Sequence, residues 1–164
     1  MISLSLRLLE QIPFFWGFSM EERATLLQEE GDLFATFSPG DYLCREGEED
    51  GALFVMMRGK IKVTRAAAPD TILVELGEGA VMGELAFLLG QPRSAHVIAT
   101  EEVTAFKVDE QTMTKLEHGL QMKIIRELVA ILVKRLDETN EALLSQKSIN
   151  ATLVEALRLA KLGE

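Results

Sequence analysis

Glycine recurs at short intervals in the middle of this chain, and this spacing constrains the fold more than any other feature of the sequence. Nine of the twelve glycines fall between residues 31 and 90, where they separate short segments rich in valine, leucine, phenylalanine and threonine. Frequent turns between short β-prone segments are typical of an all-β barrel or sandwich. One such turn, REGEEDG at residues 45–51, predicts an acidic hairpin loop ahead of the strand ALFVMMR.

Helical patterns precede the glycine-rich region. Residues 4–11 carry apolar side chains at helical spacing. Ser19 followed by Glu22 predicts a capping box that opens a second helix, which extends to about Glu30.

A long helix is predicted after the glycine-rich region. A short helix opened by Asp109 or Glu110 ends near Gly119, and the long helix follows from about Leu120. Its apolar residues step by three and four: Ile125, Val129, Leu132, Leu136 and Leu143, with Thr139 at the place that completes the rhythm. This heptad seam predicts a parallel helix pair, and hence a homodimer through residues 120–146. Packing of the seam on the chain's own β-body is the alternative.

Composition limits both the size of the protein and its partners. The 164 residues suffice for one good core, so we expect a single domain: a body at residues 1–119, with a long helix and short helical tail at 120–164. The net charge is −9, and it is uneven: residues 1–110 hold 9 basic and 19 acidic side chains, residues 111–164 hold 8 and 7. An acidic body repels phosphate backbones and acidic lipids, so we expect neither nucleic acid nor a membrane as partner.

The sequence shows no sign of export. Its first residues, MISLSLRLLEQIPFFW, lack a basic leader, and no stretch approaches the ~18 uninterrupted apolar residues of a membrane span. Cys44 is the only cysteine, so no internal disulfide is expected, and a small buried side chain on a strand is its predicted role. Cytoplasmic is the localisation that fits these features.

Residues 82–99, MGELAFLLGQPRSAHVIA, carry the most specific motif. The Glu84 carboxylate could accept a hydrogen bond from a sugar hydroxyl, and the guanidinium of Arg93 could bind a phosphate. Gly83 lets the backbone approach a ligand, and the apolar run from Glu84 to Leu89 predicts a short helix whose free N–H groups face an anion. The presence of both Glu84 and Arg93 at this spacing favours a site for a small phosphorylated sugar over an ordinary ion pair between these two residues.

The motif resembles the phosphate-binding cassette of the cyclic nucleotide-binding domain family, which runs Gly-Glu-Leu-Ala, a short apolar helix, then Pro-Arg-Ser-Ala. GDYLCREGEEDGALFVMMRGKIKV and LGEGAVMGE also resemble the family's β-roll, so the resemblance covers most of residues 10–145. It implies a mainly β fold: a β-roll of the double-stranded β-helix or jelly-roll kind, with N-terminal helices, a short cassette helix and a long C-terminal helix.

The resemblance also implies roles for individual residues. Glu84 would hold the ribose 2′-hydroxyl, Arg93 the cyclic phosphate, and Ser94, with the amides around Leu85 and Ala95, the remaining phosphate oxygens. The expected ligand-binding residues are Met82, Gly83, Glu84, Leu85, Ala86, Arg93, Ser94, Ala95, Leu73, Leu76, Arg135, Thr139 and Asn140.

Some of these residues have a second interpretation. Leu73 and Leu76 lie where the family lines the ribose and base with aliphatic side chains, and plain core packing is the alternative. In the bacterial catabolite activator branch, a threonine and a following polar residue on the long helix contact the base, as Thr139-Asn140 would here. A threonine bonded to its own helix backbone is the alternative. Arg135 would pair with Glu84, contact the ligand, or remain solvated.

These features predict a cyclic nucleotide sensor that signals through its C-terminal helix to an effector protein, with cAMP favoured over cGMP because of Ser94 and Thr139. A dimerising adaptor that binds no nucleotide, or the sensory part of a longer Crp-like transcription regulator, are the alternatives. The tail at residues 147–164 is too short for a helix-turn-helix, so direct DNA binding is not expected. No cluster of residues indicates a metal or a catalytic nucleophile, so we do not expect an enzyme.

Overall fold

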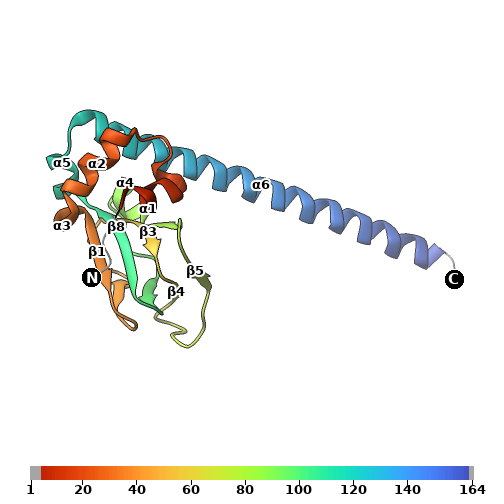
Figure 1. Cartoon of the computed structure of the whole chain (residues 1–164). Helices are drawn as coiled ribbons and strands as arrows, with labels where there is room; N and C mark the ends of the chain where they lie inside the picture. Colours follow the sequence, from red (N-terminus) through yellow and green to blue (C-terminus); the bar gives the residue numbers. More distant parts are fainter. Residues whose placement is uncertain (1–4, 163–164) are drawn as a thin grey trace. The chain divides into compact units, whose positions relative to one another are not determined.

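The computed structural model describes residues 5–162 (Figure 1), and the chain divides into two compact units after Ile124. The first unit contains all the strands of the described residues. The elements are, in chain order, α1 Leu6–Gln11, the 3-10 helix η1 Pro13–Phe15, α2 Met20–Gln28, α3 Glu30–Leu33, β1 Phe34–Phe37, β2 Tyr42–Cys44, β3 Leu53–Arg58, β4 Ile61–Thr64, β5 Val74–Leu76, β6 Val81–Met82, α4 Glu84–Leu89, β7 His96–Ala99, β8 Val103–Val108, α5 Glu110–Lys115 and α6 His118–Leu162.

The strands of the first unit form two four-stranded antiparallel sheets, ordered β1-β8-β3-β6 and β2-β7-β4-β5. Neighbours in each sheet are mostly distant in sequence, as a jelly-roll topology requires. The predicted mainly β fold with flanking helices is therefore confirmed. The predicted hairpin at residues 45–51 is wrong: β2 and β3 lie in different sheets, so the loop crosses from one sheet to the other.

Strand β3 is buried on both of its faces, and this explains its continuous apolar run. Phe54 and Met56 lie in the core cluster that holds residues from both sheets. Val55 points the other way, opposite Phe106 of β8. Phe106 packs edge-on against Phe15 of η1, with ring centroids 5.1 Å apart. The N-terminal helical segment thus covers the outer face of the first sheet.

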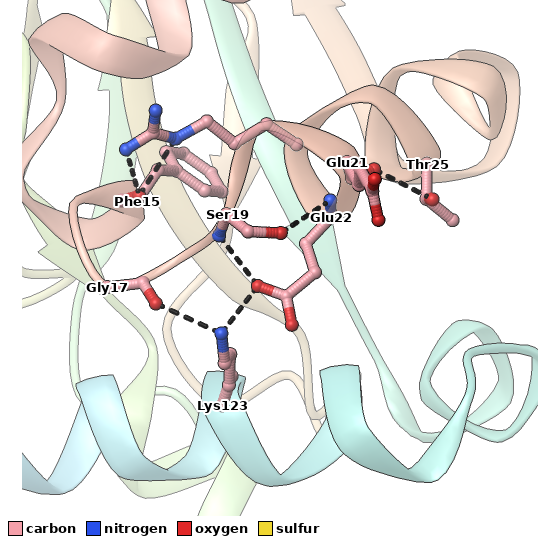
Figure 2. Close-up of polar contacts among 8 residues, drawn as sticks. Phe15, Gly17, Ser19, Glu21, Glu22, Thr25 and Lys123 are labelled. Carbon is pink, nitrogen blue, oxygen red and sulfur yellow. Dashed lines mark hydrogen bonds and ion pairs between the residues drawn. The ribbon is translucent and has the colours of Figure 1, made fainter.

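The capping box at the start of α2 is confirmed. Glu22 N–H donates to the Ser19 hydroxyl at 3.2 Å, and Ser19 N–H donates to the Glu22 carboxylate at 2.7 Å. The ammonium group of Lys123, on the first part of α6, donates to the same Glu22 carboxylate at 2.5 Å and to the Gly17 carbonyl at 3.1 Å (Figure 2). The start of α6 is therefore attached to the start of α2 within the first unit.

Helix α6 differs from the prediction at both ends. It begins at His118, so Gly119 lies in its first turn and does not end the preceding helix. It then runs without a break for 45 residues, so the expected separate tail helix is a continuation of α6. No proline or glycine occurs between residues 120 and 162 to stop the helix.

Candidate functional site

The candidate site lies in the connection between β6 and β7. The predicted short helix is confirmed as α4, Glu84–Leu89, and a glycine in the left-handed region flanks it on each side: Gly83 with φ 83° and Gly90 with φ 63°. An L-residue with a side chain rarely adopts such backbone angles, so these two glycines allow so short a helix to be entered and left sharply. This arrangement brings Glu84 into the first turn of α4, directly after Gly83.

Arg93 is buried, with its side chain only 4% exposed. Its Nε group donates to the Asp50 carboxylate at 2.7 Å, and Nη2 forms an ion pair with the same carboxylate at 2.6 Å. Nη2 also donates to the Ala52 carbonyl at 2.6 Å. A buried charge must be paired and hydrogen-bonded to be tolerated, and both conditions are met here. The guanidinium is therefore held in one orientation by the segment that enters β3.

The backbone fixes the position of Arg93 as well. Arg93 N–H donates to the Glu48 carbonyl, and Gly47 N–H donates to the Arg93 carbonyl, both at 2.8 Å. The acidic loop at residues 45–51 thus holds Arg93 through main chain and side chain together.

Gly83 packs directly against this arginine. A Cβ atom added at residue 83 would overlap the Arg93 Nη1 atom and the Ala52 carbonyl oxygen. The two halves of the sequence motif, Gly83-Glu84 and Arg93, are therefore brought together in space, ten residues apart in the chain. The close approach requires glycine for steric reasons as well as for its backbone angles.

The other predicted residues of the first unit differ in exposure. Met82 and Ala86 are buried, Leu85 is half exposed, Ser94 is exposed and Ala95 is partly buried. Leu76 is partly buried and packs against the core cluster. Leu73 is 55% exposed, so core packing does not explain this residue.

Three predicted residues, Arg135, Thr139 and Asn140, lie on α6 in the second unit, and all three are exposed. The Thr139 hydroxyl donates to the Arg135 carbonyl at 2.8 Å. The threonine therefore uses its one donor within its own helix and keeps its oxygen as an acceptor.

Asp50 and Ala52 are the site residues that the sequence analysis missed. The loop they border holds four acidic residues, Glu46, Glu48, Glu49 and Asp50, and sequence spacing does not distinguish among them as the partner of an arginine 43 residues away. The available signal was general: a motif arginine in an apolar setting needs a counter-ion, and this loop is the densest run of acidic residues in the sequence.

Within residues 5–162, no helix is long and apolar enough to cross a membrane. Over the same range, no group of three or more His, Cys, Asp or Glu side chains is arranged to hold a metal ion. Cys44 is buried on β2 as expected, and burial raises the pKa of its thiol, so the thiolate form is disfavoured.

The fold and the site together define a class of protein: a β-roll domain with a short glycine-flanked helix and a buried, preorganised arginine inserted between two strands. The sequence pattern of the cyclic nucleotide-binding domain matches residues 34–118, just over half of the chain. The protein belongs to the cyclic nucleotide-binding domain family, whose shared domain is regulatory and not catalytic.

Known relatives place this domain in several kinds of protein. cGMP-dependent protein kinase 2 of Mus musculus is 31% identical over 134 residues, which cover 78% of this chain but only 18% of the kinase. The N-terminal domain of a transcriptional regulator from Streptomyces coelicolor A3(2) is similar in structure, with a TM-score of 0.61 and 27% identity, covering 82% of this chain and 96% of that one. The regulatory subunit of a cAMP-independent protein kinase A from Trypanosoma brucei has a TM-score of 0.59 and 27% identity, covering 81% and 44%.

Proposed function

We propose that the protein is a cyclic nucleotide sensor that binds cAMP in preference to cGMP and transmits binding through α6 to a partner. The observation that carries the proposal is the buried Arg93, held by Asp50 and Ala52 against the backbone of Gly83. A preorganised guanidinium binds a phosphate without first losing side-chain freedom, so more of the interaction energy contributes to affinity.

Each cassette residue has a proposed role. Arg93 binds the cyclic phosphate, and Glu84, in the first turn of α4, accepts a hydrogen bond from the ribose 2′-hydroxyl. Ser94, whose side chain is exposed, and the amides around Leu85 and Ala95 bind the remaining phosphate oxygens. Met82, Gly83 and Ala86 form the apolar support of this surface, and Leu76 and the exposed Leu73 lie beside the sugar and base.

The hydrogen bonding of Thr139 supports the proposed preference for cAMP. Its hydroxyl proton is donated to the Arg135 carbonyl, so the threonine oxygen is available to the base only as an acceptor. Adenine offers an N6 amino donor at the place where guanine offers the O6 acceptor. A Thr139 that accepts therefore suits adenine, and the neighbouring Asn140 adds an amide that bonds the same base edge.

We propose that α6 also forms the subunit contact. Seam residues Leu136 and Leu143 are 59% and 50% exposed, and burial against a second copy removes this apolar surface from water. The homodimer through residues 120–146 then places base contacts on the helix that joins the subunits. Arg135, one helical turn before Thr139 on the same helix, is proposed as a further ligand contact.

Calorimetric titration with cAMP and cGMP tests the proposal. We expect both to bind, cAMP more tightly, and Arg93→Ala to weaken cAMP binding between about tenfold and more than a hundredfold, since a charge-assisted contact contributes about 1.5–3 kcal/mol. Arg65→Ala, at an exposed arginine of the β4–β5 loop, is the control. Arg93→Lys keeps the charge without the two-nitrogen fork and should fall between wild type and Arg93→Ala.

If neither cAMP nor cGMP gives a heat of binding in these titrations, the adaptor that binds no nucleotide would be favoured instead. Unchanged affinity in a folded Arg93→Ala protein would overturn the assignment of the site.

The similarity to the N-terminal domain of a transcriptional regulator favours a second candidate, in which this sensor controls transcription as part of a longer protein. In that case cAMP should change the affinity of the longer protein for DNA. Fluorescence anisotropy of a labelled duplex, with and without cAMP, measures this change.

A further inference from the structure

The far part of α6 exposes more apolar surface than a solitary helix in water should. Every side chain from residue 133 to residue 161 is exposed. Large aliphatic residues occur along this whole stretch, and Leu153 and Leu157 are 56% and 64% exposed. Exposed apolar side chains in this number along one helix indicate a surface that is covered by a partner.

The heptad seam does not end at Leu143. The same alternation of three and four residues leads on to Gln146, Asn150, Leu153, Leu157 and Ala160. The helix is unbroken over this range, so these residues stay in phase with the seam that begins at Ile125. The extended seam thus has a polar layer in the middle and an apolar layer at each end.

We propose that residues 146–162 continue the helix pair as a parallel, in-register coiled coil between two copies of this chain, with Gln146 and Asn150 setting the register. The proposal rests on the homodimer of the proposed function and extends it beyond residue 146. In the heptad notation Asn150 occupies an a position, where a single asparagine specifies register and oligomeric state at some cost in stability.

The polar layer formed by Gln146 and Asn150 indicates which partner covers this part of α6, and in which direction the partner helix runs. In the parallel, in-register pair, Gln146 and Asn150 each face their own counterpart, so that amide bonds amide. An antiparallel pair with full overlap places Gln146 opposite Leu143, and a parallel pair shifted by one heptad places Asn150 opposite Leu143. Both leave buried amide groups without partners.

The flanking positions agree with the parallel pair. There each g residue lies near the e residue five positions further along the partner. The resulting pairs are Arg135–Asn140, Ala142–Lys147, Ile149–Val154 and Ala156–Lys161. None of them opposes like charges, and Ile149–Val154 widens the apolar contact beyond the polar layer.

Two alanine-to-cysteine variants of the full chain test the direction and the register. Ala160→Cys is at a d position of the seam, whereas Ala151→Cys, the matched control, is at an outward b position. The native Cys44 is buried. Under mild oxidation at low protein concentration, Ala160→Cys should convert to a disulfide-linked dimer, because in-register d positions come within disulfide distance, and Ala151→Cys should remain uncrosslinked.

Analytical ultracentrifugation of the wild type and of Asn150→Leu tests the polar layer. The wild type should be a dimer, and Asn150→Leu should add higher-order species and raise the midpoint of helix melting. A dimer that fails to crosslink at residue 160, or an Asn150→Leu protein identical to wild type, overturns this proposal alone. A monomeric wild type overturns the homodimer as well, whereas nucleotide binding is judged separately by the calorimetric titration.

Discussion

At the scale of single residues, the site depends on one close contact. Gly83 lies against the guanidinium of Arg93 and the carbonyl of Ala52, so that no side chain fits at residue 83. Gly90, at the other end of α4, also has a positive φ, but nothing lies within 4 Å of a Cβ atom added there. Comparing substitutions at the two glycines therefore distinguishes the effect of backbone strain from the effect of displacing the Arg93 side chain.

Gly83→Ala should weaken cAMP binding much more than Gly90→Ala. Both substitutions place alanine in the left-handed region and should lower the free energy of unfolding by about 1 kcal/mol from strain. Only Gly83→Ala also displaces Arg93, so it should reduce affinity at least tenfold, a change of about 1.4 kcal/mol. Urea denaturation and calorimetry measure the two effects, and equal loss of affinity in both variants would contradict the steric argument.

Asp50→Asn should lower both stability and affinity. The substitution removes the negative counter-ion of a buried guanidinium but keeps the size of the side chain, and the Asp50 side chain is 35% exposed, so solvent reduces the cost. We expect a loss of about 1–2 kcal/mol in the free energy of unfolding, measured by urea denaturation. Glu49→Gln, at the exposed neighbour, is the control and should change stability little.

At the scale of elements, the contact between α2 and α6 joins the N-terminal helices to the helix proposed to carry the signal. The Lys123 ammonium bonds the carboxylate that also closes the α2 capping box (Figure 2). The hydrogen bond from Lys123, followed by that from the Ser19 backbone, holds the pKa of Glu22 below its usual range. A shift of the first turns of α6 would therefore act on α2 as well.

This contact should be lost in acid. A carboxylate whose folded-state pKa is lowered stabilises the protein above its unfolded pKa, and the stabilisation disappears as the pH falls through the folded pKa. Between about pH 5 and pH 3, the wild type should therefore lose more stability than Glu22→Gln, by less than about 1 kcal/mol because both partners are partly exposed.

The difference in the free energy of unfolding between the wild type and Glu22→Gln, measured by urea denaturation at each pH, gives the contribution of the Glu22 carboxylate. Asp109 contributes equally to both. Burial acts to raise the pKa of Asp109, but hydrogen bonds from Thr112 outweigh it and lower the pKa. Parallel stability curves for the wild type and Glu22→Gln would rule out the role of Glu22.

At the scale of the whole molecule, the charge of the site is opposite in sign to the net charge of the protein. The protein carries a net charge of −9, yet Arg93 is the one buried charged residue among residues 5–29 and 31–161, whose burial the structure describes. Attraction of an anionic ligand therefore comes from local hydrogen bonds and not from the overall field. Binding is thus expected to depend weakly on salt compared with proteins that bind nucleic acids.

Saturating cAMP should raise the Tm of the whole chain. At a ligand concentration 100 times the Kd, binding to the folded state alone adds about 2.7 kcal/mol. For a chain of this size that corresponds to a Tm increase of roughly 5–11 °C. Thermal shift assays with cAMP and cGMP measure it: at equal concentrations the increase should be larger with cAMP than with cGMP. For Arg93→Ala the increase with cAMP should be smaller by about half or more, as a tenfold or greater loss of affinity requires. A larger shift with cGMP would reverse the proposed preference.

Features that depend on neighbours in the chain could be predicted closely. The capping box of Ser19 and Glu22, the short helix after Gly83 and the strand within ALFVMMR all form where expected, because caps and side-chain patterns are read within a few residues. Features that depend on strand pairing could not be predicted from the sequence. The supposed hairpin at residues 45–51 connects two different sheets, since turn residues reveal a change of direction but not the partner of the next strand.

The sequence by itself determined the β-rich body, the flanking helices and the cassette that carries Glu84 and Arg93. Only the tertiary structure decided which acid pairs with Arg93, why residue 83 must be glycine, and that Lys123 bonds Glu22 about a hundred residues earlier in the chain. The physical reason is that a short motif encodes the chemistry of its own side chains. The counter-ion of a buried charge is selected among several equivalent carboxylates only when the chain closes around that charge.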